Sequence, residues 1–134
     1  MPHPPLPDDL CALLDKPNPA VVATVRKDGH PVTVATWYVT DGDHLLVSMD
    51  DTRVRLKHLL RDPRISLTVL DEDDWYTHVS LVGRVVQTAP DDGLVDIDRI
   101  SKHYTGRPYP DRESPRTSAW IEIERYHGWG KASS

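Results

Sequence analysis

Three basic side chains lie close together just after an apolar segment. Arg53, Arg55 and Lys57 follow the segment 48–52, Ser-Met-Asp-Asp-Thr, where a strand is expected to end and a helix to begin. The N-terminus of a helix carries a partial positive charge and free N–H groups, so clustered cations are favourable there only if an anion lies among them. Arginine can bind two phosphate oxygens at once, and lysine acts as a point charge. This segment therefore indicates a phosphate-binding site.

The same pattern also fits a solvated helix face that binds nothing. Asp50 and Asp51 can neutralise the cations. Helical spacing places Arg53 and Lys57 on one face and Arg55 away from them, so loop geometry would have to bring Arg55 back. Both interpretations stay open on the pattern alone.

Other kinds of site have little support in the sequence. The seven histidines are scattered, Cys11 is the only cysteine, and no metal-ligand spacing or glycine-rich phosphate loop occurs. A formal net charge of −5 at pH 7 disfavours binding to nucleic acid or to anionic membranes. No nucleophile or acid–base pair stands out, so the catalytic residues are left unassigned.

The spacing of the apolar residues predicts short strands joined by tight turns. Asp28-Gly29 and Asp41-Gly42 supply the positive φ angles of hairpin turns, and Gly83 marks a bulge. Strands are expected over residues 20–26, 31–40, 44–49, 64–70, 75–87 and 117–129, and helices over 8–15, 52–61 and 91–104. About six antiparallel strands with short helices predict a mainly β protein built on a closed or nearly closed barrel.

The chain is expected to form one domain. Residues 1–7 contain four prolines and are predicted to be a disordered leader, followed by a single domain over 8–134. Alternating apolar residues on both sides of the segment 31–40 suggest that both of its faces are covered, which favours a dimer. Cys11 is expected to be buried and inert, and Val95 to point inward with Ile97 and Ile100. No signal pattern or membrane-length apolar run is present, so a cytoplasmic location is expected.

Several segments together carry a family resemblance. They are Asp28-Gly29-His30-Pro31-Val32-Thr33-Val34, the segment from Trp37 through Asp41-Gly42-Asp43 to Ser48, the basic cluster, and Arg61-Asp62-Pro63-Arg64-Ile65-Ser66-Leu67. Their order and spacing resemble the pyridoxamine-phosphate-oxidase-like superfamily of flavin-binding split barrels over residues 20–129. Within it, the chain is most similar to the actinobacterial branch of deazaflavin-dependent reductases, to which 104–110 and 123–130 also bear a likeness.

The resemblance implies a homodimer with two coenzyme sites at its interface. Pro31, Thr33 and Val34 would lie along the tricyclic ring. The ribityl and phosphate region would be held by Ser48, Met49, Arg53, Arg55 and Lys57. Trp75, Tyr76 and His78 of the second subunit would close the site. The family helix often carries Asn where this chain has His58.

The resemblance also implies the chemistry. The expected function is hydride transfer between coenzyme F420 and a small unsaturated or conjugated organic substrate, with the coenzyme supplying the chemistry and the protein positioning it. Tyr76, His78, His103 and Tyr104 are candidate proton donors. FMN in place of the deazaflavin, or a non-catalytic coenzyme- or tetrapyrrole-binding protein, are the alternatives.

Overall fold

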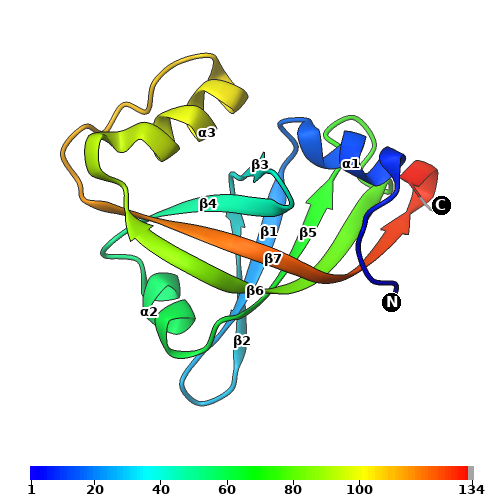
Figure 1. Ribbon diagram of the computed structural model, residues 1–134, viewed down its shortest axis with the longest axis horizontal. Coiled ribbons are helices and arrows are strands. Elements are labelled where there is room, and N and C mark those ends of the chain that lie inside the picture. The colour runs from blue at the N-terminus through cyan, green and yellow to red at the C-terminus, as the bar shows by residue number, and fades with distance from the viewer. Residues whose placement is uncertain (133–134) are drawn as a thin grey trace.

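The computed structural model describes residues 1–132, in which seven antiparallel strands form one sheet (Figure 1). Along the sheet the strand order is β2-β1-β5-β6-β7-β4-β3, so β2 and β3 lie at its two edges. The strands are β1 (Ala20–Val25), β2 (Pro31–Thr36), β3 (Val39–Asp41), β4 (His44–Asp50), β5 (Arg64–Leu70), β6 (His78–Pro90) and β7 (Arg116–Trp129). This mainly β fold confirms the predicted class, with one strand more than expected.

The two longest strands, β6 and β7, form the centre of the sheet and bend across the molecule. Their pairing register shifts between Val82 and Gly83, which confirms the predicted bulge. A Cβ atom on Gly83 would lie 2.1 Å from the backbone oxygen of Glu122, so only glycine fits there without a backbone shift. The core fills the concave side with alternating apolar residues of β1, β4, β5, β6 and β7.

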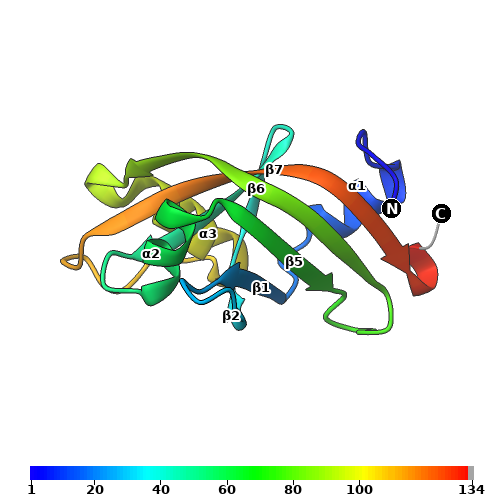
Figure 2. The same ribbon diagram turned by 90° about the horizontal axis from the view of Figure 1, so that it is seen from below.

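Three helices cover the ends of the sheet: α1 (Asp8–Asp15), α2 (Val54–Arg61) and α3 (Val95–Thr105). In both ribbon views α2 and α3 lie toward one end, and α1 with both chain termini lies toward the other (Figures 1 and 2). Leu56 and Leu59 of α2 are buried in the core, and Ile100 of α3 packs with Val39 and Leu46 in a smaller cluster. No helix within the described residues is long and apolar enough to cross a membrane.

The segment 31–40 is not one strand, as the sequence suggested, but two. It breaks at Trp37 and Tyr38, so that β2 pairs with β1 and β3 pairs with β4 at the opposite edge of the sheet. The buried Tyr38 hydroxyl donates to the Leu14 carbonyl oxygen at 2.7 Å, which fixes the crossing point. Most residues of β2 are exposed in the single chain, so the helices of the same chain do not cover both faces of this strand.

Three other elements begin two to four residues later than expected. The strand expected from Trp75 begins at His78, since Thr77 donates to Asp74 from both its backbone and its hydroxyl. The helix expected from Asp91 begins at Val95, because Gly93 has a φ of 77°. The Asp91 carboxylate accepts bonds from the backbone of Asp96 and Ile97, which caps the helix. At α2, the expected start at Thr52 moves to Val54.

Two side chains, those of Cys11 and Val95, are exposed although the sequence pattern predicted them to be buried. Cys11 is exposed rather than buried, because it faces away from the inward row of α1 leucines. Val95, expected to point inward, is 69% exposed at the first position of α3. Residues 1–7 lie along β7 in this structure. Leu6 packs against the core there, and the Pro2 carbonyl oxygen accepts a bond from the Tyr126 N–H at 3.1 Å.

Candidate functional site

A pocket of about 600 Å³ opens at the end of the molecule that carries α2 and α3. Strands β1 and β2 line it with Ala20, Ala35 and Thr36, and helix α3 lines it with Ile97 and Ile100. This size suits a small organic ligand or part of a coenzyme. Elements from distant parts of the sequence therefore meet around one cavity.

Three arginines line this pocket. Arg53 immediately precedes α2, Arg55 is in its first turn, and Arg116 begins β7. Within residues 1–132 none of the three forms an ion pair with a carboxylate, whereas Arg26, Arg64, Arg99 and Arg112 all do. Burial, followed by the charges of Arg53 and Arg116, lowers the pKa of Arg55. The pocket thus gathers positive charge without a paired anion.

Arg116 is held in place by two neutral neighbours. Its Nε donates to the Ser48 hydroxyl oxygen at 3.0 Å, and its guanidinium carbon lies 4.8 Å from the centre of the Tyr109 ring. No hydrogen bond from its two terminal nitrogens is present within the described residues, so these can donate to a ligand. A guanidinium fixed in this way keeps its planar donor geometry, which matches a carboxylate or phosphate.

Two carboxylates also line the pocket, but each already accepts other hydrogen bonds. Asp50 accepts from the backbone N–H of Thr52 at 2.9 Å and from its hydroxyl at 2.8 Å, and these bonds lower its pKa, with smaller contributions from Arg116 and Arg53. The hydroxyl and backbone of Ser114 and the backbone of Glu113 hold the pKa of Asp111 at about 2. Both groups are therefore ionised at neutral pH, and the three arginines exceed them by one charge.

Aromatic rings beside Arg116 form one wall of the pocket. Trp37 stacks on Tyr104 with ring centres 5.1 Å apart and planes 9° apart, and Tyr109 meets Trp37 edge to face. All three side chains line the pocket, and Trp37 remains 37% exposed. A flat apolar group can therefore lie on this wall while an anionic group reaches the arginines.

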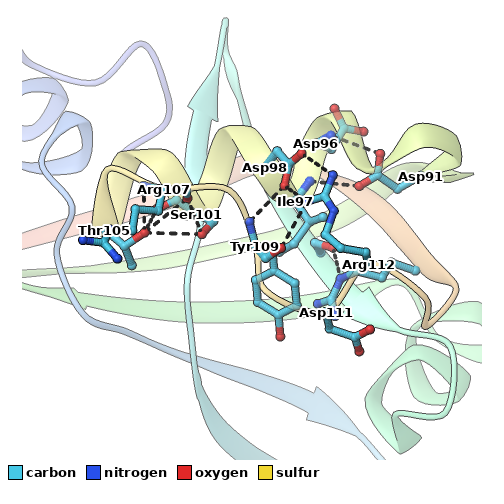
Figure 3. Close-up of polar contacts among 12 residues, drawn as sticks. Asp91, Asp96, Ile97, Asp98, Ser101, Thr105, Arg107, Tyr109, Asp111 and Arg112 are labelled. Carbon is cyan, nitrogen blue, oxygen red and sulfur yellow. Dashed lines mark hydrogen bonds and ion pairs between the residues drawn. The ribbon is translucent and has the colours of Figure 1, made fainter.

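The segment 106–115, which follows α3, carries Tyr109 and Asp111 into the pocket; we call it the strap (Figure 3). Asp98 of α3 accepts a bond from the Tyr109 N–H at 2.9 Å and pairs with Arg112 at 2.6 Å. At the other end, the Ser101 hydroxyl donates to the Arg107 carbonyl oxygen at 2.8 Å. Figure 3 shows Tyr109 pointing away from α3, so these contacts fix the strap as a wall of the cavity.

A buried hydrogen bond anchors α2 to the sheet behind the basic residues. His58 Nδ1 lies 3.0 Å from the hydroxyl of Thr24 on β1, and both residues are buried. No side chain caps the N-terminus of α2, and its first turn has no acidic residue. An uncapped helix start with basic side chains provides donors for an anion.

The structure brings together some of the residues expected to bind a coenzyme. Ser48, Arg53 and Arg55 line the pocket, and loop geometry does bring Arg55 beside Arg53. Lys57 is exposed on α2 outside the pocket lining, and the Met49 side chain is buried in the core with 1% exposure.

The residues expected along the ring lie on β2 beside the pocket. Pro31, Thr33 and Val34 are exposed, and Ala35, the next residue of that strand, reaches the pocket.

The residues expected from a second subunit lie away from this pocket. Tyr76 belongs to a separate cavity of about 470 Å³ beside Trp129, and His78 stacks on Trp129 with ring centres 5.7 Å apart. Trp75 is 72% exposed. Figure 1 places the start of β6 near α1, at the other end of the sheet. Within one chain these side chains cannot close the arginine pocket.

Of the candidate proton donors, only Tyr104 reaches the pocket. Its hydroxyl donates to the Asn18 carbonyl oxygen at 2.7 Å, and burial raises its pKa to about 12. A hydroxyl bound in this way is a poor acid near neutral pH. His103 is half-buried with its ring edge-on to Tyr104 and does not line the pocket.

Sequence reasoning missed Arg116, Tyr109 and Trp37 as site residues. Arg116 pairs in register with Asp50 across β4 and β7, which is what brings it to the basic cluster. That register could not be derived from the sequence. The only local signal was the position of Arg116, directly after Pro115 at the start of a strand.

Comparison with known proteins identifies the family of this pocket-bearing barrel. The model of the pyridoxamine 5'-phosphate oxidase family matches residues 6–130. The chain belongs to this pyridoxamine 5'-phosphate oxidase family. Its members are oxidoreductases that bind flavin-type coenzymes, FMN or F420. The arginines of the pocket, which form no ion pair within residues 1–132, and the exposed strand beside them fit such a phosphate-bearing coenzyme.

Solved structures share the fold of this family member. An F420 reductase is 25% identical, with a TM-score of 0.78 over 86% of this chain and 93% of that one. A conserved hypothetical protein from Mycobacterium tuberculosis is 22% identical, with a TM-score of 0.74 over 95% and 86%. General stress protein 26 from Bacillus anthracis is 15% identical, with a TM-score of 0.71 over 91% and 92%. The last two likenesses concern the fold alone.

Proposed function

We propose that this protein is a reductase that uses coenzyme F420 and acts on a small conjugated organic substrate. The observation that carries the proposal is the arginine pocket. Arg53, Arg55 and Arg116 converge there without a carboxylate partner in the described part of the chain, next to an exposed strand and an aromatic wall. An oxidoreductase of this family needs these features to hold a phosphate and a flat ring.

In this proposal the phosphate binds at the start of α2. Arg53 and Arg55 supply charge, the uncapped helix start supplies N–H donors, and Lys57 adds a charge from the exposed side. Ser48 lies at the ribityl region, and Met49 contributes only its backbone because its side chain is in the core.

The ring lies along the exposed residues Pro31, Thr33 and Val34 of β2. When bound in its reduced form, the coenzyme supplies a hydride for the substrate. The chain positions the two partners and limits access of water. Tyr104 does not supply the proton, because its hydroxyl donates to the Asn18 carbonyl oxygen and burial raises its pKa to about 12.

F420 is favoured over FMN by the likeness to an F420 reductase at 25% identity. FMN is the second candidate, because the family model is that of pyridoxamine 5'-phosphate oxidase and the same arginines suit either phosphate. FMN ends in a phosphate monoester, whereas the phosphate of F420 continues into a carboxylate-bearing tail. The two coenzymes can therefore be separated by direct binding.

The proposal includes a homodimer whose second subunit completes each site. Exposed β2 provides a surface for a partner, with Val34 41% exposed. Trp75, Tyr76 and His78 lie too far from the arginine pocket to serve it in the same chain. In a dimer they would cover the ring bound to the other subunit.

Fluorescence titration of the purified protein with F420 and, separately, with FMN tests the proposal. We expect tight binding of F420. The Arg55→Gln variant should bind it about 10- to 100-fold more weakly, because a charge-assisted hydrogen bond is lost. Arg107→Gln is the matched control, since Arg107 is exposed on the strap and outside the pocket.

Each outcome decides between the candidates. Tight binding of FMN alone would replace F420 by FMN. Binding of neither coenzyme would remove the proposed function, and equal weakening by Arg55→Gln and Arg107→Gln would remove the arginine pocket as the coenzyme site.

A further inference from the structure

In the proposed site, Arg53 and Arg55 bind the coenzyme phosphate without Arg116. Arg53 and Arg55 lie together at the start of α2, where the helix terminus already favours an anion. Arg116 comes from a different element, β7, and is oriented by Ser48 and Tyr109 rather than by α2. Its two terminal nitrogens make no hydrogen bond within residues 1–132. These two nitrogens can therefore bind an anionic group other than the phosphate.

The surroundings of Arg116 point to the shape of the molecule that carries this group. Tyr109 lies under the Arg116 guanidinium and also meets the Trp37 ring edge-on, with centres 6.4 Å apart. Trp37 is backed by Tyr104. The rings lie beside the guanidinium on one wall, so a planar group on Trp37 can direct an attached anion to Arg116.

Contacts within the chain hold this wall in place. Asp98 and Ser101 fix the strap at both ends, and Arg112 adds two bonds to Asp98 (Figure 3). The Tyr38 N–H and the Asn18 carbonyl oxygen both bind the Tyr104 hydroxyl. A preorganised wall loses little conformational entropy when a ligand binds, which favours specific binding of one ligand shape over non-specific binding.

We propose that Arg116, with the rings of Trp37 and Tyr109, forms the substrate subsite and selects a planar substrate that carries a carboxylate. This deepens the proposed function and rests on it for the reaction, because the substrate must lie beside the coenzyme ring on β2. A carboxylate accepts two parallel bonds from a guanidinium, whereas a neutral ester or amide of the same shape leaves the Arg116 donors poorly matched. Arg116 is thus a specificity-determining residue, and neutral conjugated compounds are weaker substrates.

The test measures the binding of 2-naphthoate and of 2-naphthamide, which have the same flat ring system and differ in charge. Calorimetric titrations are made with the wild type, Arg116→Gln and Arg107→Gln, each with and without saturating F420. We expect the wild type and Arg107→Gln to prefer the carboxylate by about 10-fold or more, and Arg116→Gln to lose that preference. Arg116→Lys, which keeps the charge, should recover part of it.

Other outcomes overturn the inference in different ways. Equal binding of the two probes by the wild type, or a preference that survives in Arg116→Gln, would remove the substrate role of Arg116. If Arg116→Gln weakened F420 instead and left naphthoate unchanged, Arg116 would belong to the coenzyme site. If the wild type bound no coenzyme but still preferred naphthoate through Arg116, the proposed function would fail while the carboxylate subsite stood. A matched thermal unfolding curve shows that each variant is folded.

Discussion

Single residues that never touch a ligand decide where the basic side chains lie. His58, at the position where the family resemblance leads us to expect Asn, is hydrogen-bonded to Thr24 across the α2–β1 contact. Arg55 and Lys57 lie on the same short helix, so their positions depend on this anchor. The His58 side chain therefore makes its hydrogen bond to Thr24 inside the protein and does not point to the coenzyme site.

Replacing Thr24 by valine tests this anchor. The change keeps the shape of the side chain but leaves the His58 Nδ1 atom buried without its partner, which should lower the free energy of unfolding by about 1–3 kcal/mol. Coenzyme affinity should fall with it, because α2 is less firmly held. Urea unfolding measures the first effect and fluorescence titration the second.

The exposed Thr88→Val variant is the control, since Thr88 lies on β6 outside the pocket and its change removes no buried bond. If Thr24→Val were as stable as Thr88→Val, the bond would not anchor the helix.

At the scale of elements, the sequence predicted what depends on local preference and missed what depends on pairing. The predictions of a turn at Asp28-Gly29 and of a bulge at Gly83 were correct, because the local backbone conformation requires glycine at both places. The φ of 87° at Gly29 shows this for the turn. The break at Trp37 and Tyr38 was missed because both residues continue a strand-like pattern, and only the Tyr38 bond to Leu14 in α1 turns the chain away. The basic helix was found, but Arg116 was not, because its place opposite Asp50 depends on a long-range register.

The strap gives a prediction at this scale. Asp98→Ala removes the bonds to Tyr109 and Arg112 that hold the segment 106–115 on α3. We expect faster hydrogen exchange at the Tyr109 amide and weaker binding of 2-naphthoate, because the aromatic wall becomes mobile. Global stability should change little, since exposed ion pairs contribute little to it.

Asp62→Ala provides the comparison, because it breaks the ion pair with Arg64, in which the carboxylate is about as exposed as that of Asp98 and which does not involve the strap. Slower exchange at Tyr109 in the Asp98 variant, or the same loss of binding in both variants, would contradict the role given to the strap.

At the scale of the whole molecule, the chain carries its two groups of ring-binding candidates at opposite ends. The arginine pocket lies with α2 and α3, and the group of Tyr76, His78 and Trp129 lies near α1. Both ends expose large apolar side chains, including Trp37 at one and Trp75 at the other. An antiparallel pairing of two copies would bring the arginine pocket of each copy against the Tyr76 and His78 end of its partner. The separation seen in one chain is thus what a shared site in a symmetric dimer requires.

Subunit complementation tests that arrangement directly. Arg55→Gln damages the arginine pocket, and Tyr76→Ala damages the surface expected to cover the partner's coenzyme. Each variant alone should bind F420 weakly. When the two are mixed after unfolding and refolded together, half of the dimers are mixed, and each mixed dimer holds one site with both residues intact. Tight sites should therefore return to about a quarter of the wild-type number, counted by fluorescence titration.

If the two residues served the same chain, mixing would restore nothing. Full affinity in Tyr76→Ala alone, or a monomer by light scattering, would remove the second subunit from the site.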